Sequence, residues 1–125
     1  MQVPNHAGEA HRMLVQLRKA GVNLLAFTGF PSGRGSQMDF VPANSAAFRK
    51  AAKAAGWKIG KAKTGFLIQG ADRAGALDGT LSKLARARIN VTAVDGVAAG
   101  GGRFGAVLWV KSKDFSKASK TLKAR

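Results

Sequence analysis

Cysteine is absent from this chain. Disulfide bonds, thiolate nucleophiles and cysteine-type zinc or iron–sulfur sites are therefore excluded as sources of its stability or chemistry. Long apolar runs are also lacking: no stretch approaches the ~18 apolar residues that span a bilayer, and the N-terminus lacks the basic and then hydrophobic pattern of a secretory signal. We therefore expect a cytoplasmic protein with no membrane contact.

Acidic residues are scarce. Six Asp and Glu face 21 Lys and Arg, which leaves a formal net charge of +15, and the bases are spread over both halves of the chain. A field of this size attracts anions, so nucleic acid is one candidate partner. The same charge is also typical of a solvated helix surface coated with lysine, and charge alone does not decide between the two.

Groups suited to catalysis are few. His6 and His11 lie five positions apart with only Glu9 beside them, which does not match the i, i+4 spacing of a helical metal pair. The acids form no obvious pair for acid–base work, and no serine occupies a nucleophile-elbow pattern. We predict no catalytic residue, no metal site and no cofactor, and interpret the chain as a binding protein.

What the chain does contain is an internal repeat. A shift of 67 positions (75 − 8 = 67) superimposes its two halves and aligns identical residues along both. The aligned identities include Gly8 with Gly75, Leu14 with Leu81, Asn23 with Asn90, Phe48 with Phe115 and Lys53 with Lys120. This period is too long for a solenoid unit and indicates two copies of one small domain, so function is expected at paired sites or at the seam between copies.

Each copy shows the same order of predicted elements. Apolar residues at helical spacing predict a helix over residues 8–21 and its counterpart through Leu77, Leu81 and Leu84. Apolar and alternating segments predict strands over residues 22–30, 38–41, 89–97 and 104–110, joined in pairs by glycine-bearing turns. A second helix follows each hairpin, and short strands are predicted at residues 57–59 and 66–68.

This order predicts an α+β protein made of two ferredoxin-like (βαββαβ, split βαβ) repeats, with helices covering one face of each antiparallel sheet. The outer strands are missing at both chain ends, because only residues 1–4 stand where the first strand of copy one should be, and no strand segment follows the last helix. A missing strand leaves backbone groups without partners. We therefore predict that a strand from the other copy or from another subunit closes the gap, and we expect a homodimer.

Two stretches resemble the ACT domain. Residues 70–77, Gly-Ala-Asp-Arg-Ala-Gly-Ala-Leu, lead through Leu81 and Leu84 to Ile89 and Asn90, which is similar to that family's loop, leucine-rich helix and strand start. Copy one carries a weaker version at residues 5–8 and 21–23, and alanine replaces the family's usual proline before the glycine in both copies. The resemblance assigns residues 1–63 to a first ACT-like repeat with a truncated first strand, and residues 64–125 to a second repeat whose final strand is absent.

The resemblance implies a tandem regulatory module. Such a module binds a small amino-acid-like ligand at the loop before the first helix, at the repeat or subunit interface, and a separate enzyme is a candidate partner. Free N–H groups at a helix N-terminus attract a carboxylate, Asp72 is expected to pair with a ligand ammonium, and the Asn90 amide can both donate and accept. The predicted ligand-binding residues are Asp72, Arg73, Gly75, Ala76 and Asn90, with Asn5, Gly8 and Asn23 forming the first-copy site. The competing interpretation is that these are ordinary capping and turn residues.

A second hypothesis is an RNA-binding or other nucleic-acid-binding protein. Residues 103–109 form a basic and aromatic string similar to that of the RNA-recognition motif, which shares this topology. In this alternative Arg103, Phe104 and Trp109 contact the nucleic acid. Ala106 occupies the place of a stacking aromatic, however, so core packing or a dimer face is favoured for the two rings. The G-x-G-x-x-G pattern at residues 100–105 continues into a strand and predicts a hairpin turn. An orphan structural domain without ligand is the third hypothesis.

Overall fold

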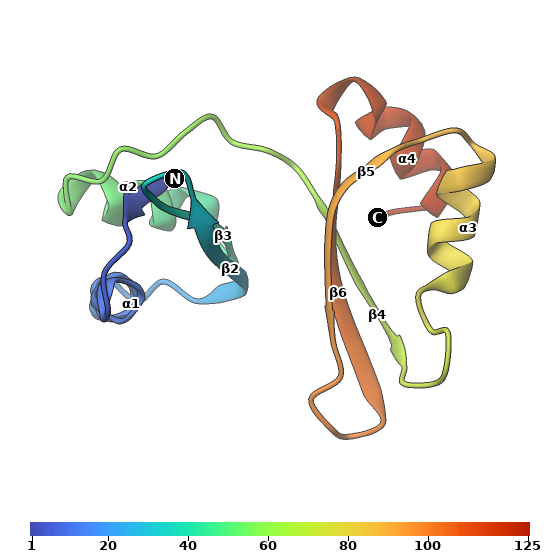
Figure 1. Ribbon diagram of the computed structural model, residues 1–125, viewed down its shortest axis with the longest axis horizontal. Coiled ribbons are helices and arrows are strands. Elements are labelled where there is room, and N and C mark those ends of the chain that lie inside the picture. The colour runs from blue at the N-terminus through green and yellow to red at the C-terminus, as the bar shows by residue number, and fades with distance from the viewer. The chain divides into compact units, whose positions relative to one another are not determined.

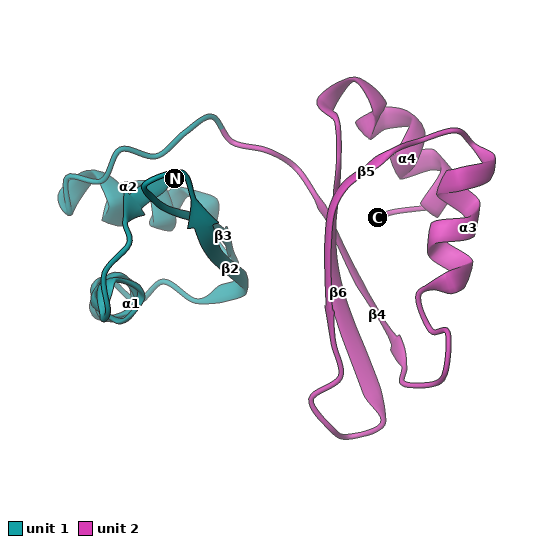
Figure 2. Ribbon diagram, in the orientation of Figure 1, with its two compact units in different colours: residues 1–61 teal, residues 62–125 magenta.

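The computed structural model describes all 125 residues and contains two compact units, unit 1 (Met1–Lys61) and unit 2 (Ala62–Arg125) (Figures 1 and 2). Unit 1 consists of β1 (Gln2–Pro4), α1 (Glu9–Lys19), β2 (Leu24–Ser32), β3 (Gly35–Pro42) and α2 (Ser45–Ala54). Unit 2 consists of β4 (Phe66–Ala71), α3 (Asp78–Arg86), β5 (Val91–Val97), β6 (Arg103–Val110), a short 3-10 turn (Ser112–Asp114) and α4 (Phe115–Leu122).

Both units contain a three-stranded antiparallel sheet with the same topology. The strand order is β1-β3-β2 in unit 1 and β4-β6-β5 in unit 2, so the hairpin's second strand is central in each. In unit 2 the two helices lie together on one face of the sheet (Figure 1). The predicted α+β fold with two ferredoxin-like repeats is confirmed. No helix of the chain combines the length and the apolar character that crossing a membrane requires.

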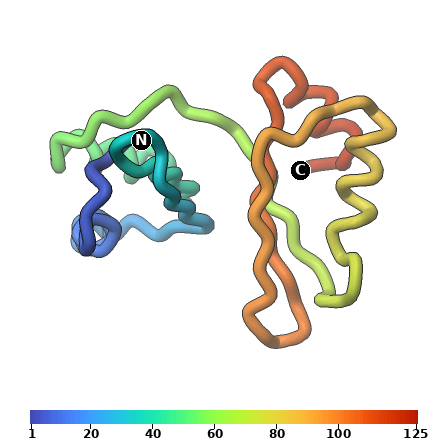
Figure 3. Tube along the Cα trace, viewed as in Figure 1, coloured from blue at the N-terminus to red at the C-terminus, as the bar shows by residue number.

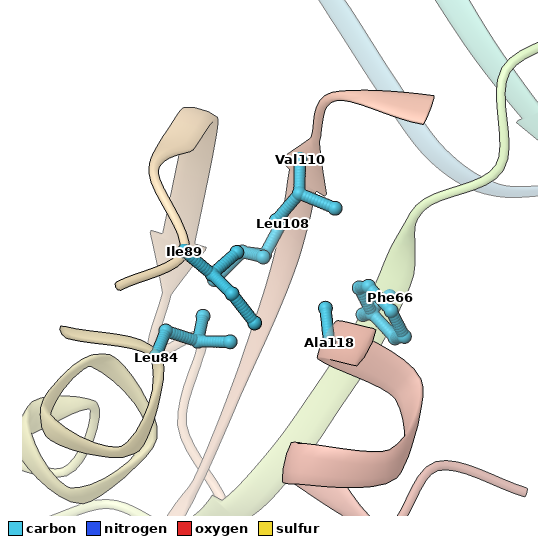
Figure 4. Packing of buried hydrophobic residues seen from close by; sticks show 6 residues of the cluster. All are labelled: Phe66, Leu84, Ile89, Leu108, Val110 and Ala118. Carbon is cyan, nitrogen blue, oxygen red and sulfur yellow. The ribbon is translucent and has the colours of Figure 1, made fainter. Parts of the chain in front are cut away.

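The core of unit 2 forms where the apolar sides of α3 and α4 meet the sheet. Figure 4 shows side chains from β4, α3, the turn after α3, β6 and α4 converging on one cluster, which consists of Phe66, Leu84, Ile89, Leu108, Val110 and Ala118. Leu84 and Leu108 are almost fully buried, and burial of one such side chain stabilises the fold by about 1.5–3 kcal/mol.

The core of unit 1 is built around aromatic rings. Phe40 on β3 lies between Phe27, Phe48 and Trp57, with ring centroids 5.2, 5.3 and 6.1 Å away. Helix α1 adds Met13 and Leu17, which are four positions apart and therefore on one side of the helix. The helical spacing of apolar residues in the sequence thus identifies the side of α1 on which Met13 and Leu17 are buried.

Helix α1 ends in a turn that returns the chain directly to the core. Gly21 has φ 72°, its N–H donates to the Arg18 carbonyl, and the Val22 N–H donates to the Leu17 carbonyl at 2.9 Å. This is the Schellman motif, in which the residue after the left-handed position packs against the last helical turn. Val22 and Leu17 are accordingly buried in one cluster.

The same turn ends the other three helices. Gly56, Arg88 and Lys123 all have positive φ. In each case the N–H of this residue donates to the carbonyl three positions back, and the N–H of the next residue donates to the carbonyl five positions back. These positions obey the 67-residue offset, because 21 + 67 = 88 and 56 + 67 = 123. Unit 2 therefore carries basic residues where unit 1 carries glycine, although a residue with a Cβ is about 1–2 kcal/mol less stable in the left-handed region.

Two strand predictions at the borders of unit 1 were wrong. The first strand of copy one is not missing: Gln2, Val3 and Pro4 pair with Gln37, Ser36 and Gly35 of β3, so residues of the same chain occupy the gap that we assigned to a neighbouring strand. Strand β1 can approach β3 this closely because residue 35 is glycine. A Cβ at this position would overlap the Val3 carbonyl oxygen.

The strand predicted at residues 57–59 does not form. The Trp57 N–H instead closes the turn after α2 by donating to the Ala52 carbonyl at 2.9 Å, and its ring packs on the unit 1 core. The apolar residue Trp57 therefore anchors the end of α2 to the core and does not belong to a strand. No strand follows α4, as predicted.

Exchange of the helix-ending residues between the units is expected to change their stabilities in opposite directions. Arg88→Gly should raise the free energy of unfolding of unit 2 by about 0.5–1 kcal/mol, because relief of the left-handed strain exceeds the loss of a cation at the helix C-terminus. Urea unfolding followed by Trp109 fluorescence in a Trp57→Phe background measures this.

The reciprocal change, Gly21→Arg, should lower the free energy of unfolding of unit 1 by about 1 kcal/mol. Trp57 fluorescence in a Trp109→Phe background reports on that unit. A stabilised Gly21→Arg variant would contradict the role given to the turn.

Candidate functional site

A hollow of about 360 Å³ lies at the N-terminal end of α1 in unit 1. Its polar groups come from Asn5, in the loop between β1 and α1, and from Ser36 on β3. The Ser36 hydroxyl donates to the Asn5 side-chain oxygen at 3.2 Å, and Ser36 is a buried polar residue. The remaining wall is mostly apolar and consists of Ala10, Phe27, Gly29, Phe30, Pro31 and Met38.

A second hollow, of about 410 Å³, lies at the C-terminal end of the same helix. Its polar side chains are Arg18, on the last turn of α1, and Asn23, just after the Schellman turn. The Asn23 carbonyl accepts from the Ala43 N–H at 2.9 Å, while its exposed side chain makes no hydrogen bond. The other lining residues are Leu14, Leu17, Gly21, Val22 and Leu24.

In unit 2 the predicted site loop, residues 72–77, lies beside the turn of the β5–β6 hairpin (Figure 3). The Asp72 N–H donates to the Gly102 carbonyl at 2.9 Å, which fixes the start of the loop against that turn. Asp72 and Arg73 are exposed, and Gly75 has φ 71°. The two hollows described above do not border this loop.

The predicted residues of each copy fall at opposite ends of a helix. Asn5 and Gly8 precede α1 and Asn23 follows it, and α1 has 11 residues, which corresponds to about 16 Å. Residues 72–76 precede α3, whose nine residues correspond to about 14 Å, and Asn90 follows it. A single amino-acid-sized ligand cannot contact both ends within one copy, so the structure does not bring these two groups together.

The first turns of α1 and α3 are electrostatically unfavourable for a carboxylate. Glu9 begins α1, and the hydrogen bond from the Arg12 guanidinium holds the pKa of the Glu9 carboxyl below its usual range and raises the pKa of Arg12. Asp78 occupies the first turn of α3. An anionic ligand is therefore better held by the side-chain N–H groups of Asn5 than by the exposed helix terminus itself.

The residues of the nucleic-acid alternative do not form one surface. Side chains alternate along a strand, so Phe104 and Trp109, five positions apart on β6, point to opposite faces of the sheet. Phe104 shares its face with the core residues Leu108 and Val110, whereas Trp109 and Arg103 share the other. The two rings cannot stack consecutive bases side by side, and this version of RNA binding is not supported.

Ser36 is the residue of the candidate site that sequence reasoning missed. Its burial depends on the pairing of Val3 with Ser36 across β1 and β3, a contact between segments far apart in the chain. The signal that could have revealed it was Gly35 at the start of β3, because a glycine within a strand indicates close approach of another backbone.

No protein-family model matches the chain, and no curated protein matches it. Solved structures do match it. Protein BT0572 from Bacteroides thetaiotaomicron superimposes with a TM-score of 0.83 at 18% identity, covering 98% of this chain and 82% of the other. Aspartate kinase from Clostridium acetobutylicum, described as an allosteric enzyme, superimposes with a TM-score of 0.55 at 16% identity over 97% of this chain.

These likenesses show the fold alone. The match covers only 30% of the aspartate kinase chain. The likeness to protein BT0572 covers 98% of this chain and therefore includes residues of both units.

Removal of the Ser36 hydroxyl tests the packing of the Asn5 loop. Ser36→Ala is expected to lower the free energy of unfolding of unit 1 by about 1 kcal/mol, because the partly buried hydrogen bond to Asn5 is lost. Ser45→Ala is the control, since Ser45 is exposed and its side chain makes no hydrogen bond. Equal effects of the two substitutions in urea unfolding would contradict a structural role for the Ser36–Asn5 pair.

Proposed function

We propose that this chain is a non-catalytic regulatory module that binds a small amino-acid-like ligand at a repeat or subunit interface. The observation that carries the proposal is the pair of hollows at the two ends of α1, each with a predicted asparagine in its wall. The resemblance of both copies to the ACT domain supports the proposal. In unit 2 the corresponding groups are the loop Asp72, Arg73, Gly75 and Ala76 and the residue Asn90.

The chemistry of the N-terminal hollow suits an α-amino acid with an apolar side chain. The Asn5 amide nitrogen makes no hydrogen bond within the chain and is available to donate to a carboxylate, and the Ser36 oxygen can accept from an ammonium group. Phe27, Phe30 and Met38 provide apolar wall against which an aliphatic or aromatic side chain can pack.

The separation of the two hollows points to a shared site. If a second subunit packs beside the first about a twofold axis perpendicular to α1, its α1 runs antiparallel, and the N-terminal hollow of one copy meets the C-terminal hollow of the other. Leu14, the central residue of α1, and its repeat counterpart Leu81 are 38% and 36% exposed, so an apolar side chain lies where such an axis would pass. Asn23 of one copy would then complete the site that Asn5 begins in the other.

A ligand held between two copies regulates by linkage. Because it binds only the paired arrangement, it shifts the population toward that arrangement by its difference in affinity, and a separate enzyme can recognise the paired state.

A thermal-shift screen against the twenty amino acids tests the ligand. We expect a rise in melting temperature for apolar amino acids, because ligand at a hundredfold excess over its Kd adds about 2.7 kcal/mol to the stability of the native state. Asn5→Ala and Asn23→Ala should each abolish the shift at the first site, and Asp72→Ala and Asn90→Ala should do so at the second. Gln16→Ala, on the exposed side of α1, is the control, and a flat screen would refute the proposal.

Light scattering tests the interface. We expect twice the chain mass in solution, and a fall to the monomer mass when Leu14→Lys places a charge at the proposed axis. Gln16→Lys adds the same charge to the same helix and should leave the dimer intact. A monomer that nonetheless binds an amino acid would retain the ligand and exclude the shared site.

A further inference from the structure

The second helices of the two units, α2 and α4, carry matching cationic surfaces. Lys50 and Lys53 on α2 correspond to Lys117 and Lys120 on α4 at the 67-residue offset, so an i, i+3 lysine pair is present in both copies. All four side chains are exposed. Residues three apart on a helix lie on the same side, with Cβ atoms about 5–6 Å apart. We call these two pairs the lysine stripes.

The lysine stripes lie on the side of each helix that faces away from the core. In α2 the buried residues are Phe48 and Ala52, and in α4 the buried residue is Ala118 with Phe115 and Leu122 packed beside it. Each helix is thus anchored by one side and presents its ammonium groups on the other. Their position is fixed by core packing rather than by contacts among the charges.

The charge of the stripes is not neutralised within the chain. The only side-chain ion pair joins Arg12 to Glu9, and the only other pair joins the N-terminal ammonium to Asp39. Residues 45–63 contain six Lys and Arg with no Asp or Glu, and residues 111–125 contain six with one Asp. The surroundings of both stripes therefore add to their positive potential.

We propose that the lysine stripes of α2 and α4 bind the phosphodiester backbone of nucleic acid without sequence preference. Contact with phosphates requires cations and displaces condensed counterions, and it needs no apolar or aromatic anchor. This surface is separate from the small-ligand hollows, whose polar residues are Asn5, Ser36, Arg18 and Asn23.

The absence of apolar side chains on the same surface favours nucleic acid over other anionic partners. None of the exposed large hydrophobic residues lies on α2 or α4. An amphipathic helix that lies on a membrane inserts an apolar face, and a protein interface depends on aromatic or aliphatic anchors. The stripes offer only charge, which is what a phosphate backbone recognises.

Two charge-matched variants test the proposal. The stripe variant combines Lys50→Gln, Lys53→Gln, Lys117→Gln and Lys120→Gln, and the control combines Lys19→Gln, Arg34→Gln, Lys83→Gln and Arg86→Gln, all at exposed positions. Both lower the net charge from +15 to +11, since four charges are removed. Circular dichroism establishes that both variants are folded before binding is measured.

Fluorescence anisotropy with a short mixed-sequence DNA duplex, between about 50 and 200 mM salt, gives the dependence of affinity on salt. The wild-type chain should bind, and the stripe variant should reduce the slope of log K against log salt by about 2–4, because each lost phosphate contact contributes about 0.9. The control should change the slope by about 1 or less. Equal losses in the two variants would overturn the proposal, because net charge alone would then account for binding.

Further probes identify the source of the phosphates. An RNA duplex and a single strand of either nucleic acid distinguish the form preferred, and binding to any of them with the same loss in the stripe variant supports the proposal. Binding to phosphatidylserine vesicles but to no nucleic acid would overturn it. Loss of binding in Trp109→Ala, with the stripe variant unaffected, would also overturn it, because the sheet face would then carry the contact.

Discussion

The turn that ends each helix is the constraint on which the rest of this structure depends. It places one residue in the left-handed region and returns the next to the core, as Val22 and Ile89 show. The strand that follows must therefore run back along the helix, which fixes the hairpin's position against it. The same turn sets Asn23 and Asn90 immediately beyond the helix, at the end remote from Asn5 and Asp72. The separation of the candidate site residues thus follows from the backbone conformation of this turn rather than from a network of polar side chains.

Much of the fold could be predicted because its signals are local. Helix α1 carries Met13 and Leu17 at helical spacing, and β5 and β6 alternate or run apolar between glycine-bearing turns. The exceptions depend on distant contacts. A three-residue strand such as β1 has no periodicity of its own and forms because Gly35 lets it approach β3. Trp57 has strand-like neighbours in sequence, yet its environment is the aromatic core around Phe40.

The candidate site was predictable only in part. Asn5 and Asn23 stand out because their repeat counterparts occupy the same sequence positions, but their separation by a whole helix appears only in three dimensions. Ser36 has no sequence signal beyond the neighbouring Gly35, since its role depends on Asn5, thirty-one positions away. The opposite orientations of Phe104 and Trp109 needed no structure, because an odd spacing on a strand already places two residues on opposite faces.

The residues that end the helices also make the last helical turns of the two units unequal in stability. In unit 2, Arg88 and Lys123 occupy left-handed positions that glycine fills in unit 1. A side chain in the left-handed region strains the backbone there, whereas its positive charge is attracted to the C-terminal end of the helix dipole. Dissolved salt screens this attraction and leaves the strain unchanged. The termini of α3 and α4 should therefore fray before those of α1 and α2. Amide protons in their final turns should exchange with solvent sooner, and the difference should widen as ionic strength rises.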